Sequence, residues 1–136
     1  GVVPRTKLPL ILARIREIGT RHDIRIVNVF HAGDGNLHPI LLFDERRPEE
    51  VKRVLAASEE ILDECIACGG SVTGEHGIGV EKINFMNRLF PDADIDVMTR
   101  LRAALNPRGL LTPGKMLPTA GACGMEQIHP GRRAAL

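Results

Sequence analysis

Two β-rich runs separated by a short glycine-containing stretch constrain this chain more than any other feature. The runs cover residues 24–30 and 37–43, and the sequence Gly33-Asp34-Gly35-Asn36 lies between them. Glycine, aspartate and asparagine favour turns and tolerate positive φ, so we predict an antiparallel hairpin. Both runs carry apolar residues at odd and even positions. We therefore expect interior strands that are covered on both faces.

Three amphipathic helices accompany the predicted hairpin. Apolar residues recur at helical spacing over residues 7–21, 48–68 and 81–105. These elements predict an α+β fold in which an antiparallel sheet with a central hairpin packs against amphipathic helices. An irregular C-terminal tail at 119–136 follows them.

The third predicted helix contains a proline, so we expect it to divide around Phe90-Pro91. Its apolar residues recur with helical spacing beyond that point. We expect four of them to face inward: Ile95, Met98, Leu101 and Leu105.

The composition excludes several classes of protein. Eighteen Lys and Arg against seventeen Asp and Glu give a net charge of +1, without the basic stripe of a nucleic-acid-binding protein. No apolar run reaches the roughly 18 residues of a membrane span, and the first residues lack a signal-peptide pattern. Three cysteines, Cys65, Cys68 and Cys123, fit a reducing compartment better than a disulfide framework. We therefore expect a protein of the cytoplasm.

Two histidines flank the predicted turn. If Gly33 to Asn36 form the turn, His31 lies directly opposite His38 and on the same face of the hairpin. Opposed Cβ atoms lie about 4.5 to 5.5 Å apart, which lets both imidazoles bind one metal ion. The same register pairs apolar residues with apolar residues along both strands.

A third ligand is expected from the glycine-rich stretch at 74–79, which contains Glu75 and His76. Two histidines and one carboxylate form an open site for Zn²⁺, Fe²⁺ or Mn²⁺. Such an ion polarises a substrate hydroxyl or carbonyl oxygen. His76 is then a candidate general base.

Other interpretations of these residues are available. Single histidines on strands are more often hydrogen-bonded core residues than ligands, and Glu75-His76 can be a polar turn. The Asp34-Gly35-Asn36 sequence lacks the later glycine and glutamate of a calcium loop. Cys65 and Cys68 form a C-x-x-C pair at the end of a periodic helix, where structural thiols are expected.

Three ordered motifs resemble a known family. They are VFHAGDGNLHP at 29–39, SVTGEHGIGVEK at 71–82 and NPRGLLTPGK at 106–115. Together they resemble the C-terminal cap domain of FAD-linked oxidases of the vanillyl-alcohol-oxidase superfamily. Within this superfamily, the likeness is to the FAD subunit of glycolate oxidase and to D-lactate dehydrogenases. It covers roughly residues 4–118, and we assign residues 1–118 to the domain.

The resemblance implies a ferredoxin-like cap domain and the oxidation of a small 2-hydroxy acid by hydride transfer to FAD. It assigns His31, His38 and Glu75 as ligands of a divalent metal, Zn, Mn or Fe, and His76 as the base that takes the hydroxyl proton. Lys115 matches the segment that approaches the flavin. The implied partners are an N-terminal FAD-binding domain and an iron–sulfur electron-transfer subunit, through which the protein attaches peripherally to a membrane.

Two residues depart from the family pattern. Thr112 replaces an asparagine in the last motif, and Ile40 stands where hydroxyglutarate enzymes carry a substrate-binding asparagine. The second departure argues against hydroxyglutarate as substrate. We also expect that this chain, as a fragment, neither binds FAD tightly nor turns over substrate by itself.

Three functions therefore compete at this stage. The first is the metal-bearing cap of a flavin-dependent 2-hydroxy-acid dehydrogenase. The second is a non-catalytic α+β interaction module, and the third is a stand-alone metallohydrolase that uses His31, His38 and Glu75. Strands that are apolar on both faces, with too few helices to cover them, predict self-association into a homo-oligomer.

Overall fold

The computed structural model describes residues 1–118, and their contacts divide the chain into two compact units. Unit 1 is Gly1–Gly74, and unit 2 begins at Glu75. The predicted tail at 119–136, which includes Cys123, lies outside the described residues.

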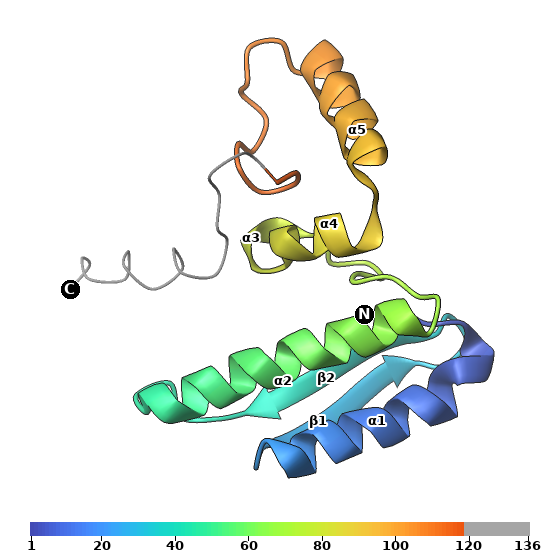
Figure 1. Ribbon diagram of the computed structural model, residues 1–136, viewed down its shortest axis with the longest axis vertical. Coiled ribbons are helices and arrows are strands. Elements are labelled where there is room, and N and C mark those ends of the chain that lie inside the picture. The colour runs from blue at the N-terminus through green and yellow to red at the C-terminus, as the bar shows by residue number, and fades with distance from the viewer. Residues whose placement is uncertain (119–136) are drawn as a thin grey trace. The chain divides into compact units, whose positions relative to one another are not determined.

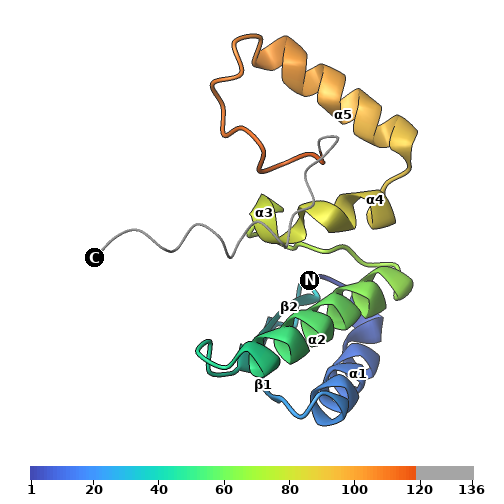
Figure 2. The same ribbon diagram turned by 60° about the vertical axis from the view of Figure 1, so that its left-hand side comes forward.

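Unit 1 contains two helices and one hairpin (Figure 1). A 3-10 turn at Arg5–Lys7 leads into α1, Leu8–Arg21, and the strands are β1, Arg25–His31, and β2, Asn36–Leu42. Helix α2, Pro48–Ala67, follows. The turned view shows α1 and α2 next to each other, in agreement with the contacts between them (Figure 2). The helices and strands predicted in this half are confirmed.

The ends of α2 follow from local sequence. Pro48 occupies the first helical position, where its missing N–H and fixed φ are tolerated, and Glu49 and Glu50 face the positive end of the helix dipole. Gly69 adopts a φ of 78° directly after the C-cap, a conformation that glycine reaches without strain. These signals define a helix that ends before the glycine-rich stretch.

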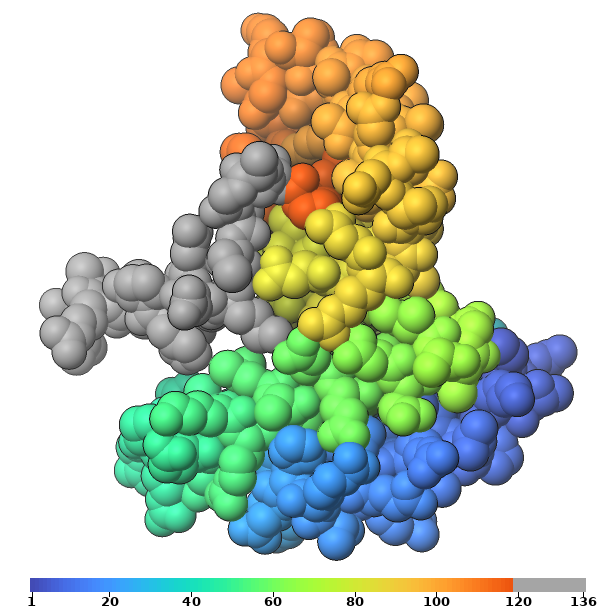
Figure 3. Space-filling model, in the orientation of Figure 1, coloured from blue at the N-terminus to red at the C-terminus, as the bar shows by residue number. Residues whose placement is uncertain are grey.

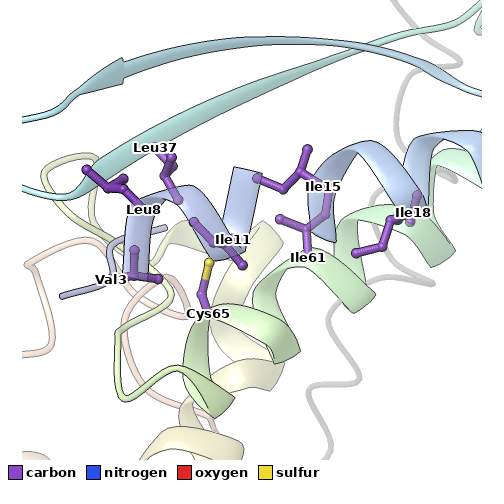
Figure 4. Packing of buried hydrophobic residues seen from close by; sticks show 9 residues of the cluster. Val3, Leu8, Ile11, Ile15, Ile18, Leu37, Ile61 and Cys65 are labelled. Atoms are coloured by element: carbon purple, nitrogen blue, oxygen red, sulfur yellow. The ribbon is translucent and has the colours of Figure 1, made fainter. Parts of the chain in front are cut away.

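The core of unit 1 lies between the two helices and one face of the hairpin (Figure 4). Ile11 and Ile15 of α1 are fully buried, and Leu37 reaches the core from β2. Cys65 lies in the same cluster with 1% of its surface exposed, as expected of a structural thiol. In the space-filling view, atoms of α1 and α2 cover most of the hairpin on the face turned to the viewer (Figure 3).

The other face of the hairpin is exposed. Four apolar side chains on it retain between 42% and 52% of their accessible surface: Val27, Val29, Ile40 and Leu42. The expectation that both faces of the strands are covered is therefore wrong for the described residues. Apolar composition favours burial, but it does not supply the layer that would cover this face.

Val2 joins the sheet through two isolated bridges. It pairs antiparallel with Asn36 on one side and with Ser71 on the other. Backbone hydrogen bonds connect Val2 with Ser71 in both directions, at 3.0 and 2.9 Å. The N-terminal residues therefore lie between β2 and the chain that leaves α2.

Unit 2 consists of short helical segments followed by one longer helix. Helix α3, Gly79–Lys82, a 3-10 turn, Ile83–Phe85, and α4, Met86–Leu89, precede α5, Asp92–Leu105. The predicted division is confirmed, because Phe90 is extended before Pro91 and interrupts the helix.

Two of the four residues expected to face inward on α5 are exposed. Leu101 and Leu105 retain 60% and 74% of their accessible surface, whereas Ile95 and Met98 are half-buried. Helical spacing predicts which residues share a face, but it does not predict whether another element packs on that face. The inward placement of Leu101 and Leu105 is therefore wrong in this structure.

The described residues thus form an α+β fold, as predicted. The only sheet of named strands among them is the antiparallel pair β1–β2. None of the described helices combines the length and the apolar character needed to cross a membrane.

Candidate metal centre

The hairpin turn differs from the predicted one by one residue. Ala32 to Gly35 form the turn, and the N–H groups of Asp34 and Gly35 both donate to the His31 carbonyl at 3.0 Å. Asn36 is thereby part of β2 and pairs with His31.

This register places the two histidines diagonally rather than directly opposite each other. His38 pairs with Val29, two residues before His31, so the expected His31–His38 pairing is wrong. The difference is an even number of residues, and both imidazoles therefore keep to the same exposed face. Their ring centroids lie 5.3 Å apart with ring planes at 89°, an edge-to-face contact.

Asn36 is a site residue that sequence reasoning did not identify. The sequence predicts Asn36 in the turn, whereas the structure places it in β2, opposite His31, with 6% of its surface exposed. The double bridge of Val2 draws it into the sheet. No local signal distinguishes a turn asparagine from this one, because its burial depends on residues 34 positions away.

Gly74 packs closely against Asn36. A Cβ built on Gly74 would lie 2.3 Å from Oδ1 of Asn36, closer than real Cβ contacts allow. Only glycine therefore lets the backbone pass the end of the hairpin at this point. Glu75 is bonded directly to Gly74, so its side chain begins close to Asn36 and to the histidine pair.

Three predicted ligands form a group that could hold a metal ion. One ligand atom from each of His31, His38 and Glu75 lies within 4.8 Å of the others. Atoms bound about 2.1 Å from one ion lie at most about 4.2 Å apart, so small side-chain rotations would suffice to reach coordination distance. Two imidazole nitrogens and one carboxylate oxygen suit Zn²⁺, Mn²⁺ or Fe²⁺.

A further polar atom near this sequence lacks a partner. The Thr73 hydroxyl oxygen is buried without a hydrogen bond among the described residues. Buried polar groups are normally hydrogen-bonded, so a water molecule or another polar group fits beside this oxygen. The donor set of His31, His38 and Glu75 fits a metal centre.

His76 lies beside the candidate ligand Glu75. Its Nε2 atom is 3.5 Å from a Glu75 carboxylate oxygen, and the two side chains are 70% and 52% exposed. An exposed imidazole next to a ligand carboxylate can exchange a proton with a bound substrate or with water.

Lys115, the predicted flavin contact, lies in the irregular segment that follows α5. This side chain is exposed, and Gly114 beside it adopts a φ of 69°. Nothing in this segment assembles a closed pocket around Lys115 in the described structure.

Two hollows on unit 1 do not match a flavin ring. One of about 460 Å³ runs along α1 and β1, and one of about 710 Å³ lies at the open end of the hairpin. Charged side chains line both, with Asp23 and Arg25 shared between them. An isoalloxazine ring fits a mostly apolar slot, so neither hollow is suited to FAD.

Comparison with known proteins gives a consistent match. A family model described as FAD linked oxidases, C-terminal domain, matches residues 1–116. The chain is 45% identical to glycolate oxidase subunit GlcD of Escherichia coli K12 over 134 residues, which cover 96% of this chain and 27% of that protein.

Two further relatives are similar over most of the chain. Glycolate oxidase subunit GlcD of Bacillus subtilis is 42% identical over 116 residues, covering 85% of this chain and 25% of the relative. A probable mitochondrial D-lactate dehydrogenase of Danio rerio is 36% identical over 115 residues, covering 85% and 23%. The chain thus spans about a quarter of the length of the curated relatives it matches.

Proposed function

This chain belongs to the family of C-terminal domains of FAD-linked oxidases, and we propose that it supplies the metal ligands and the general base of a flavin-dependent 2-hydroxy-acid oxidoreductase. The observation that carries the proposal is the convergence of ligand atoms from His31, His38 and Glu75 within 4.8 Å. We assign residues 1–118 to this domain, two residues beyond the matched region.

The roles of the chain's own residues follow from their chemistry. His31, His38 and Glu75 would hold the divalent ion, which when bound polarises the substrate hydroxyl oxygen. His76 takes the proton of that hydroxyl, because its imidazole adjoins the ligand carboxylate and is open to a bound molecule. Bound FAD would supply the acceptor for the hydride of the substrate carbon, so that loss of the hydride and of the hydroxyl proton leaves a 2-oxo acid.

The apolar side chain of Ile40 favours a small substrate. It lies two residues after His38 on the same face of β2 and is exposed there. An apolar side chain at this position offers no hydrogen bond to a second carboxylate of a longer acid. Short 2-hydroxy acids, such as the glycolate and lactate of the relatives' names, fit this surface better than hydroxyglutarate.

We propose that this chain alone does not hold FAD tightly. Each of the two hollows of unit 1 is lined by side chains of both charges rather than by an apolar slot, and Lys115 lies on an exposed segment. Lys115 remains the one proposed flavin contact. Because the E. coli and B. subtilis relatives are named as subunits of glycolate oxidase, we also propose that the chain works with partner subunits, one of them an iron–sulfur electron carrier.

The ferredoxin-like fold is proposed for unit 1 on its strand order. Val2 lies between Ser71 and Asn36, so the order across the sheet is Ser71, Val2, β2, β1. With α1 and α2 as the two connecting helices, the chain follows the βαββαβ sequence of ferredoxin-like folds. The first and fourth strands of this pattern are represented by the single bridging residues Val2 and Ser71.

Metal titration tests the ligand assignment. We expect the purified, metal-free chain to bind one Zn²⁺ or Mn²⁺ ion per molecule in isothermal calorimetry. Replacement of both ligands, His31→Ala with His38→Ala, should abolish binding, while far-UV circular dichroism stays unchanged. His22→Ala is the matched control, because His22 contacts Glu60 instead. Retained binding in the double variant would refute the assignment.

Reconstitution tests the activity. The chain is combined with the portion of the E. coli relative outside the matched region, and reduction of a dye by glycolate or D-lactate is measured. We expect turnover only in the combined protein. His76→Gln should lower kcat by about 10²- to 10⁴-fold without loss of metal. Hydrolysis of ester or amide substrates by the metal-loaded chain alone would instead favour a metallohydrolase.

A further inference from the structure

The backbone of β1 has one edge that β2 does not use. Leu37 exchanges two hydrogen bonds with Gly1, at 2.8 and 3.2 Å, so its N–H and C=O point away from β1. Successive residues of a strand point their backbone groups to opposite sides. His38, which follows Leu37, therefore faces β1, and its partner Val29 faces β2. By the same alternation, Ile26, Asn28 and Phe30 direct their backbone groups to the open edge.

These three residues form what we call the β1 edge: Ile26, Asn28 and Phe30. Among the residues that the structure describes, none of their N–H or C=O groups has a recorded backbone partner outside the hairpin. The hollow of about 460 Å³, which runs along α1 and β1, is lined in part by Ile26 and Asn28. An open row of donors and acceptors of this kind is a template for another strand.

The opposite edge of the hairpin is less able to accept a strand. Gly1 already occupies the backbone groups of Leu37. Pro39, the next residue facing that edge, has no N–H to donate. Proline is a common means of protecting an edge strand, and the β1 edge contains none.

The sequence of β1 is self-complementary about Asn28. If two copies of β1 run antiparallel with Asn28 opposite Asn28, then Ile26 faces Phe30 of the second copy, and Val27 faces Val29. In this register, residues whose backbone groups face the open edge pair with residues of the same kind. The β1–β1 ladder between the two copies can therefore form while each β1–β2 ladder stays intact. Residues 26–30 carry no charge, and no like charges oppose each other between them.

Asn28 supplies a second, independent observation. Its side-chain Oδ1 atom is buried and lacks a hydrogen-bond partner in the described structure. Leaving a buried acceptor unsatisfied is costly. In the antiparallel pairing, the two Asn28 amides lie across the twofold axis, and each Oδ1 can accept a hydrogen bond from the other's Nδ2.

We propose that two copies of this chain associate through the β1 edge and form a continuous β2–β1–β1–β2 sheet with its twofold axis at Asn28. The partner is a second copy rather than an unrelated peptide, because the register, the absence of charge over residues 26–30 and the orphan amide are all matched by the strand itself. This pairing depends on neither the metal nor the flavin.

The test compares two double variants of the full chain. Val27→Lys with Val29→Lys sets lysines opposite each other across the axis, and both parent side chains are about half exposed, so the fold should tolerate them. We expect a dimer for the parent chain in analytical ultracentrifugation over the micromolar range. In this variant, the dimer dissociation constant should rise by about tenfold or more.

The matched control separates edge pairing from stacking of the exposed face. Ile40→Lys with Leu42→Lys places the same charges on the same face, but on β2, away from the axis. We expect this control to remain dimeric. A monomeric parent chain, a dimer that survives Val27→Lys with Val29→Lys, or a dimer that both variants disrupt would each overturn the proposal.

Hydrogen exchange gives a direct readout of the edge. We expect the amides of Ile26, Asn28 and Phe30 to become more protected as the protein concentration rises, while amides in the β1–β2 ladder are protected throughout. Exchange at the β1 edge that does not depend on concentration in a dimeric sample would show that the interface lies elsewhere.

Discussion

His31 and His38 contact each other edge to face from diagonal positions of one hairpin, with their ring centroids 5.3 Å apart. His31 is the last residue of β1, and His38 is the third residue of β2, so neither imidazole depends on a flexible loop for its position. Ligands carried by strands are held more precisely than ligands carried by loops. The two histidines therefore form the rigid half of the candidate metal centre.

Gly74→Ala should disturb this centre without touching a ligand. The new Cβ would lie 2.3 Å from Oδ1 of Asn36, and the buried Asn36 amide would have to move. We expect a loss of about 1 to 3 kcal/mol in the free energy of unfolding, the usual cost of overpacking. We also expect weaker Zn²⁺ binding, because Glu75 follows directly. Urea unfolding and calorimetric titration measure the two effects.

Gly33→Ala is the control for this substitution. Gly33 lies in the hairpin turn, has no positive φ, and a Cβ built on it meets nothing within 4 Å. Replacing such a glycine restricts the unfolded chain, so stability should be unchanged or higher by up to about 1 kcal/mol. If Gly33→Ala proves as destabilising as Gly74→Ala, close packing at Gly74 is not the cause.

Ile15→Ala tests the core of unit 1. Ile15 is fully buried between the helices, and its truncation should cost about 2 to 5 kcal/mol. Leu10→Ala on the same helix should change stability by less than about 1 kcal/mol, because Leu10 is 46% exposed. If Ile15→Ala does not fold, Ile15→Val should still show a loss of about 0.5 to 1.5 kcal/mol in urea unfolding. Equal losses at the two positions would contradict the packing described for α1.

Leu105→Gln tests the exposed face of α5. Leu105 retains 74% of its accessible surface, so the substitution should change the free energy of unfolding by no more than about 0.5 kcal/mol. A loss above about 2 kcal/mol in thermal or urea unfolding would mean that this apolar face is covered in solution, as helical spacing alone predicts.

The sequence predicts which residues form the candidate site, but it does not predict how His31 and His38 pair across the hairpin. The sequence predicts that His31 and His38 share one face, because alternation along a strand is local. Whether they lie opposite or diagonal depends on where the turn begins. That point is fixed by Val2 pairing with Asn36, a contact between residues far apart in the chain.

Burial shows the same division between local and non-local information. The apolar stripe of α2 and the proline break after α4 follow from nearby residues, and both appear where they are expected. The exposure of Val27 on the hairpin and of Leu101 on α5 does not follow from nearby residues, because periodicity identifies an apolar face and not the element that covers it.

Glu60 should make the packing of α1 on α2 depend on pH. Its carboxylate oxygens contact His22 Nε2 at 3.0 Å and Arg21 at 2.6 Å, and the hydrogen bond from His22, with the charge of Arg21, lowers the pKa of Glu60. A lowered pKa in the folded state stabilises the fold above the unfolded value, near 4.3, and this contribution is lost as pH falls through the folded value. We expect Glu60→Gln to cost up to about 1 kcal/mol at neutral pH, since the pair is partly exposed. In acid, where the Glu60 carboxylate is protonated in the folded state as well, the variant should unfold like the parent chain. Glu45→Gln, at an exposed position, controls for the change in net charge. Urea unfolding at both pH values decides the question, because a difference between Glu60→Gln and the parent chain that persists at low pH cannot come from the charge of Glu60.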